Sequence, residues 1–72
     1  MKYFVILTKS HMVAQLLAKA HTLGEDGVCE ISFGAILNDE RVPAVYRDKG
    51  FFACIITYDE TADVPPYDLI IA

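Results

Sequence analysis

Residues 3–23, which read YFVILTKSHMVAQLLAKAHTL, decide the fold that we expect for this chain. The first six residues are apolar or β-favouring, and both alternating faces of a strand over residues 3–8 are apolar. This pattern is typical of a central strand that is covered on both sides. Ser10 follows, and it can begin a helix because its hydroxyl accepts a hydrogen bond from an otherwise unpaired backbone N–H.

A helix over residues 11–23 is the next element that we expect. Gly24 suits its end, because glycine adopts a left-handed conformation at little cost. The apolar residues recur at helical spacing and form the stripe expected to pack, which comprises Met12, Val13, Leu16, Leu17, Ala20 and Leu23. The opposite stripe comprises His11, Gln15, Lys19 and Thr22.

The remaining sequence predicts further strands. Residues 28–37 alternate between apolar and polar types, and residues 51–58 are apolar on both faces. Residues 67–72 predict a final strand, whereas residues 42–47 are compatible with either an edge strand or a short helical turn. We expect a single small α/β (α+β) domain over residues 1–72, with two layers and the order β-α-β-(β)-β-β. One main helix packs on one face of a four- or five-stranded mixed sheet.

A single helix can cover only one face of such a sheet. The strands over residues 3–8 and 51–58 nevertheless look apolar on both faces. Large exposed apolar patches are uncommon on monomers. We therefore expect another copy of the chain or a partner protein to cover the second face, with Phe52 and Ile56 on the oligomer face.

The composition is that of a folded, acidic protein. The chain is 54% hydrophobic and 22% charged, which excludes a disordered tail. Its formal net charge of -4 argues against direct binding of nucleic acid or of anionic membranes. No apolar run is long enough to span a membrane, and the N-terminal residues do not resemble a signal peptide. We expect a cytoplasmic protein.

The sequence holds no metal or cofactor motif. Cys29 and Cys54 fall in apolar segments, where we expect them to behave as small buried hydrophobic residues. Their spacing does not match the C-x₂₋₄-C pattern of a zinc site. The glycines form no phosphate-binding pattern. We therefore expect neither a metal nor a cofactor.

An acidic loop near the C-terminus is a candidate docking surface. Pro65 and Pro66 stiffen the loop, which lowers the entropy lost on binding. Tyrosine is a favoured anchor at protein interfaces. We expect this loop to bind a protein with a basic surface through Tyr58, Asp59, Glu60, Asp63, Tyr67 and Asp68.

The turn between the first strand and the helix is an alternative site. Ser10 and His11 occupy this turn, and the ends of strands often hold ligands and catalytic groups. A histidine there could act as a nucleophile or general base. His11 is thus the candidate catalytic residue of a small enzyme or ligand-binding domain.

Two functions are compatible with these features. The first is a non-enzymatic protein-interaction module that self-associates through the uncovered sheet face. Very small chains, including virus-encoded ones, often act as inhibitors or regulators of a larger protein, and we expect such a role here. The alternative is a small catalytic or ligand-binding domain with its site at Ser10 and His11. The absence of a catalytic motif favours the interaction module.

Overall fold

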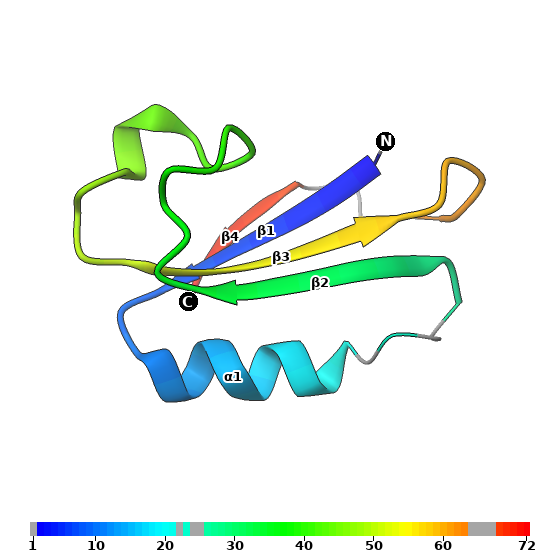
Figure 1. The fold of residues 1–72 in the computed structure, drawn as a ribbon, viewed down its shortest axis with the longest axis horizontal. Helices are drawn as coiled ribbons and strands as arrows, with labels where there is room; N and C mark the ends of the chain where they lie inside the picture. Colours follow the sequence, from blue (N-terminus) through cyan, green and yellow to red (C-terminus); the bar gives the residue numbers. More distant parts are fainter. Residues whose placement is uncertain (1, 22, 24–25, 64–67) are drawn as a thin grey trace.

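A mixed sheet of four strands and one α-helix form the observed fold (Figure 1). The computed structural model describes residues 2–21, 23, 26–63 and 68–72. The elements are β1 (Lys2–Thr8), α1 (His11–Ala20), β2 (Val28–Gly34), the 3₁₀ helix η1 (Ala44–Tyr46), β3 (Phe52–Tyr58) and β4 (Leu69–Ile71). The predicted fold class is therefore confirmed. Residues 42–47 take the alternative of a short helical turn, so the sheet has four strands.

The strand order is β2-β3-β1-β4. β3 pairs antiparallel with both β1 and β2, whereas β4 pairs parallel with β1. β1 and β2, which flank α1 in the sequence, therefore run parallel with β3 inserted between them. The two central strands are β1 and β3, the same segments whose two faces are both apolar in sequence.

Two apolar clusters lie on the two faces of the sheet. On the side of α1, the buried residues are Phe4, Ile6, Cys54, Ile56 and Tyr58. On the opposite side, they are Val5, Leu7, Val42, Ala53 and Ile55. This arrangement confirms that β1 and β3 are covered on both faces.

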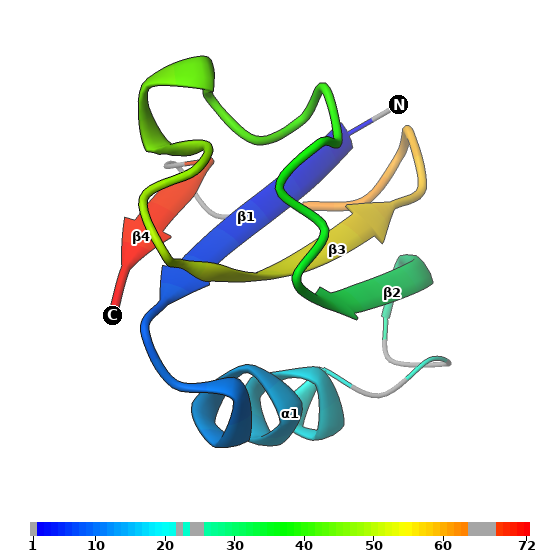
Figure 2. The same ribbon diagram turned by 60° about the vertical axis from the view of Figure 1, so that its left-hand side comes forward.

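The chain itself covers the second face of the sheet. Residues 35–51, here called the cover segment, cross that face opposite α1 (Figures 1 and 2). Apolar side chains from the whole length of the segment pack onto the sheet, namely Ile36, Leu37, Val42, Tyr46 and Phe51. The expectation that another chain must cover this face is wrong. The sequence pattern did not reveal that an irregular segment could provide the missing layer.

Arg41 anchors the cover segment to the sheet. Its Nε and Nη2 donate to the two carboxylate oxygens of Asp39 at 2.9 and 2.7 Å, and its Nη1 donates to Thr57 Oγ1 at 2.9 Å. Thr57 lies in β3 and is only 4% exposed. The hydrogen bonds from the Arg41 side chain, and then from its backbone N–H, lower the pKa of Asp39 to about 2. Arg47 Nε also donates to the Val42 carbonyl at 3.0 Å, which fixes the segment's own path.

The prediction that Cys29 is buried is wrong, because a β-bulge lies at this residue. The register shifts between Val28 and Glu30, so that Val28 pairs with Tyr58 and Glu30 with Thr57, the next residue along. The extra residue, Cys29, is exposed, and Val28 packs against the core instead. Cys54 is buried as predicted, and burial raises the pKa of its thiol to about 11.

Candidate functional site

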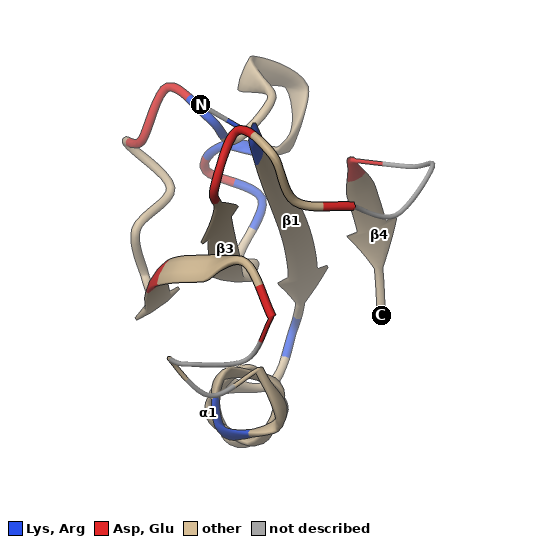
Figure 3. Ribbon diagram, turned by 90° about the vertical axis from the view of Figure 1, so that its right-hand side faces the viewer, with Lys and Arg blue, Asp and Glu red and all other residues tan. Residues whose placement is uncertain are grey.

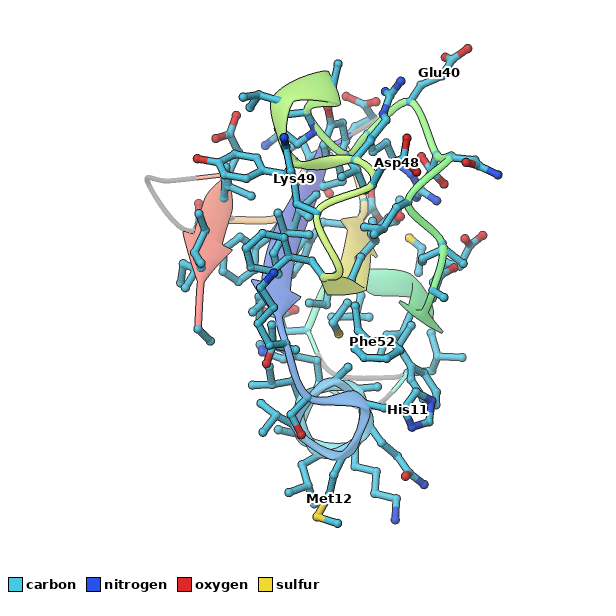
Figure 4. All side chains as sticks on the ribbon, turned by 90° about the vertical axis from the view of Figure 1, so that its left-hand side faces the viewer. His11, Met12, Glu40, Asp48, Lys49 and Phe52 are labelled. Atoms are coloured by element: carbon cyan, nitrogen blue, oxygen red, sulfur yellow. The ribbon has the colours of Figure 1, made fainter. Side chains whose placement is uncertain are left out.

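The helix α1 exposes apolar side chains on the side that faces away from the sheet. Met12 is 70% exposed and Leu16 is 57% exposed. Figure 4 shows Met12 pointing away from the strands. We call Met12, Val13 and Leu16 the outer α1 face. All three were expected to pack, so the predicted orientation of the helix is wrong.

Small residues on α1 explain this orientation. Ala14 is completely buried, and Leu17 and Ala18 pack against the core of the sheet. Because alanine has a short side chain, it allows the helix backbone to approach the strands closely. The helix is apolar on most of its circumference, so apolar side chains also lie on its outer side. Met12 and Leu16 lie there, whereas Leu17 packs against the sheet. Ser10 begins the helix as predicted, with its hydroxyl accepting from the Val13 N–H at 3.3 Å.

The helix is also shorter than predicted. α1 ends at Ala20, and the His21 N–H still donates to the Leu17 carbonyl at 3.1 Å. Leu23 lies beyond this end and is 58% exposed, so it does not pack as expected. Gly24, expected to end the helix, lies outside the described residues.

An open groove lies between α1 and β2, next to the outer α1 face. It has a volume of about 530 Å³ and is lined by Gln15, Ala18, Lys19, Leu23, Ile31 and Phe33. Phe33 is 41% exposed although it belongs to a strand. The groove and the outer α1 face form a surface that we call the α1–β2 surface. Most of its side chains are apolar, and within the described part of the chain Lys19 is the only formally charged residue that lines the groove.

His11 lies at one end of this surface, against two aromatic rings. Its ring centroid is 6.0 Å from that of Phe33 and 5.4 Å from that of Phe52, the latter in an edge-on arrangement (Figure 4). The hydroxyl of the neighbouring Ser10 accepts a hydrogen bond from the Val13 N–H and so caps the helix. These contacts place His11 in an aromatic environment that can bind an apolar or aromatic group by stacking.

The two residues of the predicted oligomer face lie on the helix side of the sheet. Ile56 is completely buried in the cluster beneath α1, so its side chain is not available to another chain. Phe52 is half-buried and contacts His11. The oligomer face predicted from these residues is therefore wrong, because α1 packs on the face that was thought to be open.

The predicted acidic docking residues lie near one end of the sheet, where β1 begins and β3 ends. Asp59, Glu60, Asp63 and Asp68 are exposed, and Figure 3 looks onto this end with the acidic residues in red. Tyr58 is only 7% exposed and belongs to the core, so it cannot serve as an exposed anchor. Pro65, Pro66 and Tyr67 lie outside the described residues.

Gly27 fixes the start of β2 beside the loop that carries Asp59. Gly27 has a φ of 82°, and a Cβ at this position would lie 2.3 Å from the Ala62 side chain. The Asp59 N–H donates to the Gly27 carbonyl at 2.7 Å, and Lys2 Nζ donates to the Ala62 carbonyl at 2.9 Å. The close approach requires glycine, because any side chain would collide with the neighbouring turn.

The described part of the chain contains no group of three or more histidine, cysteine or acidic residues that could hold a metal ion. Within the same residues, no helix is both long and apolar enough to cross a membrane. No protein-family model, no curated protein sequence and no solved structure matches this chain.

Proposed function

We propose that this chain is a non-enzymatic protein-interaction module that binds another protein through the α1–β2 surface. The observation that supports this proposal is the exposure of Met12 and Leu16 on α1 and of Leu23 in the groove. Large apolar side chains that gather at a groove are characteristic of interaction sites. A module of this kind inhibits or regulates a larger protein by occupying one of its surfaces.

Burial of these side chains can supply the binding energy. Removing a leucine or methionine side chain from water contributes about 1.5–3 kcal/mol. Methionine is flexible and polarisable, so Met12 can adapt to an irregular partner surface. Met12 and Leu16 lie on a regular helix, so little backbone conformational entropy is lost when the partner binds.

The positive charge in the groove favours a partner with an acidic group at its apolar contact. Lys19 lines the groove, although the whole chain has a formal net charge of -4. Opposite charges around an interface increase the association rate and select among partners. This partner chemistry differs from the basic surface that the sequence led us to expect.

The acidic end remains a second candidate for docking. Asp59, Glu60 and Asp63 follow the end of β3, Asp68 precedes β4, and all four are exposed and can attract a basic protein. Reversal of the charges at Asp59, Glu60 and Asp63 would weaken such a complex strongly at low salt. A complex whose affinity is insensitive to this change would exclude the acidic end.

A matched pair of variants tests the main proposal. The double variant Met12→Glu/Leu16→Glu places charge on the outer α1 face, and Val45→Glu is the control because Val45 is 68% exposed on the cover segment. We expect the wild type and the control to capture the same protein from an extract of the source cells. The double variant should capture at least about tenfold less, because a charge is costly in an apolar contact. Equal capture by all three proteins would contradict the proposal, provided that circular dichroism shows all three to be folded.

Self-association remains a prediction, but its structural basis changes. The second face of the sheet is covered, so we propose the α1–β2 surface as the contact of a homodimer. Light scattering over a concentration series would measure the mass of the wild type and of the double variant. A dimer that disappears in the double variant would identify a second copy as the partner.

The alternative of a catalytic or ligand-binding site at Ser10 and His11 is tested separately. It requires that a ligand perturb the His11 ring, which can be followed by its imidazole resonances. A small molecule that binds there and is lost in His11→Ala would favour this alternative over the interaction module.

A further inference from the structure

The outer edge of β2 carries backbone groups that no described strand pairs with. β2 is the first strand in the order β2-β3-β1-β4, so only one of its edges is paired. Such an edge can pair with an added strand. Binding of a partner strand at this edge would deepen the proposed function and rests on it.

Hydrogen bonds elsewhere in the sheet determine which residues of β2 face this edge. The Val5 N–H and the Leu7 carbonyl bond towards the segment of β4, so Phe4 and Ile6 bond towards β3. Phe4 and Ile6 pair with Ile56 and Cys54. The alternate residues of β3 must therefore bond towards β2.

Those alternate residues are Ala53, Ile55 and Thr57, and their partners in β2 are Gly34, Ser32 and Glu30. Since alternate residues of a strand bond to opposite neighbours, the N–H and C=O groups of Ile31 and Phe33 point to the outer edge.

The same two residues also line the groove. The side chains of Ile31 and Phe33 lie on the α1 side of the sheet, where Ala18 and Lys19 form the other wall. A strand added at this edge would therefore lie beside the groove, and every second side chain would enter it. The β-bulge at Cys29 limits regular pairing to the part of β2 that follows it.

The charge of the groove selects among occupants. Among the residues that the structure describes, Lys19 is the only formally charged one that lines the groove. A second copy paired at this edge would add its own Lys19 and no acidic residue from its helix. An extended segment with a carboxylate would instead place opposite charges together.

We propose that the outer edge of β2 binds an extended segment of a partner protein as an added strand. Apolar side chains of that segment occupy the α1–β2 groove, and a carboxylate lies beside Lys19. The backbone groups of Ile31 and Phe33 provide the pairing, and the groove provides the selectivity.

Selection from a library of random decapeptides displayed on phage tests this proposal. The expected peptides alternate apolar residues and contain Asp, Glu or a free C-terminal carboxylate. A synthetic copy of an enriched peptide is then added to the full chain labelled with ¹⁵N. We expect hydrogen exchange at the amides of Ile31 and Phe33 to slow at least about tenfold, because these N–H groups become bonded. The amide of Ser32, already bonded within the sheet, should exchange slowly before and after addition.

Two pairs of variants test the groove. Phe33→Lys should weaken binding of the peptide at least about tenfold, whereas Ile71→Lys should not, because Ile71 is 49% exposed on the opposite edge strand. Lys19→Glu should weaken an acidic peptide, whereas Lys49→Glu on the cover segment should not. If a variant fails to fold, exchange at the Ile31 and Phe33 amides of the wild-type chain still decides whether a strand is added.

The possible failures are distinguishable. One failure is a peptide that binds the wild type but not Met12→Glu/Leu16→Glu, and that leaves the Ile31 and Phe33 amides of the wild type unprotected. In that case strand addition is wrong and the proposed function stands. If no binding peptide is enriched, strand addition is also overturned, and the capture experiment then decides the proposed function separately. A dimer that Phe33→Lys dissociates would show that a second copy occupies the edge and would overturn the proposed occupant.

Discussion

The two faces of the sheet differ in how their covers are built. The cover segment is irregular apart from the single turn of η1, yet it buries Val42 completely. The helix α1 is regular over ten residues, yet it leaves Met12 and Leu16 largely exposed. Both faces of the sheet are nevertheless buried, so regular secondary structure is not required for a complete cover here.

The size of the side chains that point towards the sheet explains this difference. The cover segment places bulky residues such as Tyr46 and Phe51 against the strands. The helix turns Ala14, Leu17 and Ala18 towards the sheet, and Met12 and Leu16 lie on its outer side. We infer that the cover segment mainly stabilises the fold, whereas α1 also presents a binding surface.

The largest expected effect comes from a charge inside the cover. Val42→Asp should cost more than about 4 kcal/mol in the free energy of unfolding and prevent folding, because it buries an unpaired carboxylate. Val45→Asp, three residues away, should change the same free energy by less than about 0.5 kcal/mol, because Val45 is 68% exposed. Urea unfolding followed by circular dichroism measures both. Similar stabilities of the two variants would show that the cover segment does not seal the sheet.

Removal of the Arg41 anchor should have the next largest effect. Arg41→Ala leaves the buried Thr57 hydroxyl and the Asp39 carboxylate without their shared donor. We expect a loss of about 1–3 kcal/mol in the free energy of unfolding. Arg47→Ala, measured in the same urea titration, removes two side-chain hydrogen bonds to backbone carbonyls of the segment itself. An Arg41→Ala variant as stable as the wild type would mean that apolar packing alone holds the cover.

The pH dependence of the free energy of unfolding tests the Arg41–Asp39 pair separately. In the folded chain the pKa of Asp39 is about 2, below its ordinary value of 3.8. The stabilisation is therefore fully present above about pH 5 and is lost as the pH falls towards 2, where the carboxylate becomes protonated. Unfolding in urea at pH 6, 4 and 2.5 should show this loss in the wild type and a smaller loss in Asp39→Asn. Parallel pH profiles of the two proteins would contradict a role for the Arg41–Asp39 pair.

The smallest effect on stability is expected on the outer α1 face. Met12→Glu and Leu16→Glu should each change the free energy of unfolding by less than about 0.5 kcal/mol, since both positions are exposed. Ala14→Leu is the contrasting substitution, because overpacking beneath the helix costs about 1–3 kcal/mol. Thermal unfolding compares the three variants. Strong destabilisation by Leu16→Glu would mean that the outer face is part of the core.

Much of the fold could be predicted from local patterns. The segments that are apolar on both faces located the central strands, and Ser10 marked the beginning of α1. The strand predicted over residues 28–37 ends at Gly34, because the chain leaves the sheet there to form the cover segment. The bulge that exposes Cys29 depends on pairing with β3, which no local pattern reveals.

The candidate site was harder to predict than the fold. The helical spacing indicated that α1 is amphipathic, but an apolar residue can face either a core or a partner. Phe33 and Ile31 were assigned correctly to one face of a strand, yet only the strand order places that strand at an open edge beside α1. The apolar residues around most of the helix did not reveal which of its sides faces the sheet.

The sequence by itself determined which segments form the helix and the central strands, because those properties depend on neighbours a few residues apart. It also determined that both faces of the central strands need cover. Only the tertiary structure decided what covers them and which side of α1 faces outward. Those outcomes depend on contacts between distant residues, such as Arg41 with Thr57 and Ala14 with the sheet, whose energies no local pattern contains.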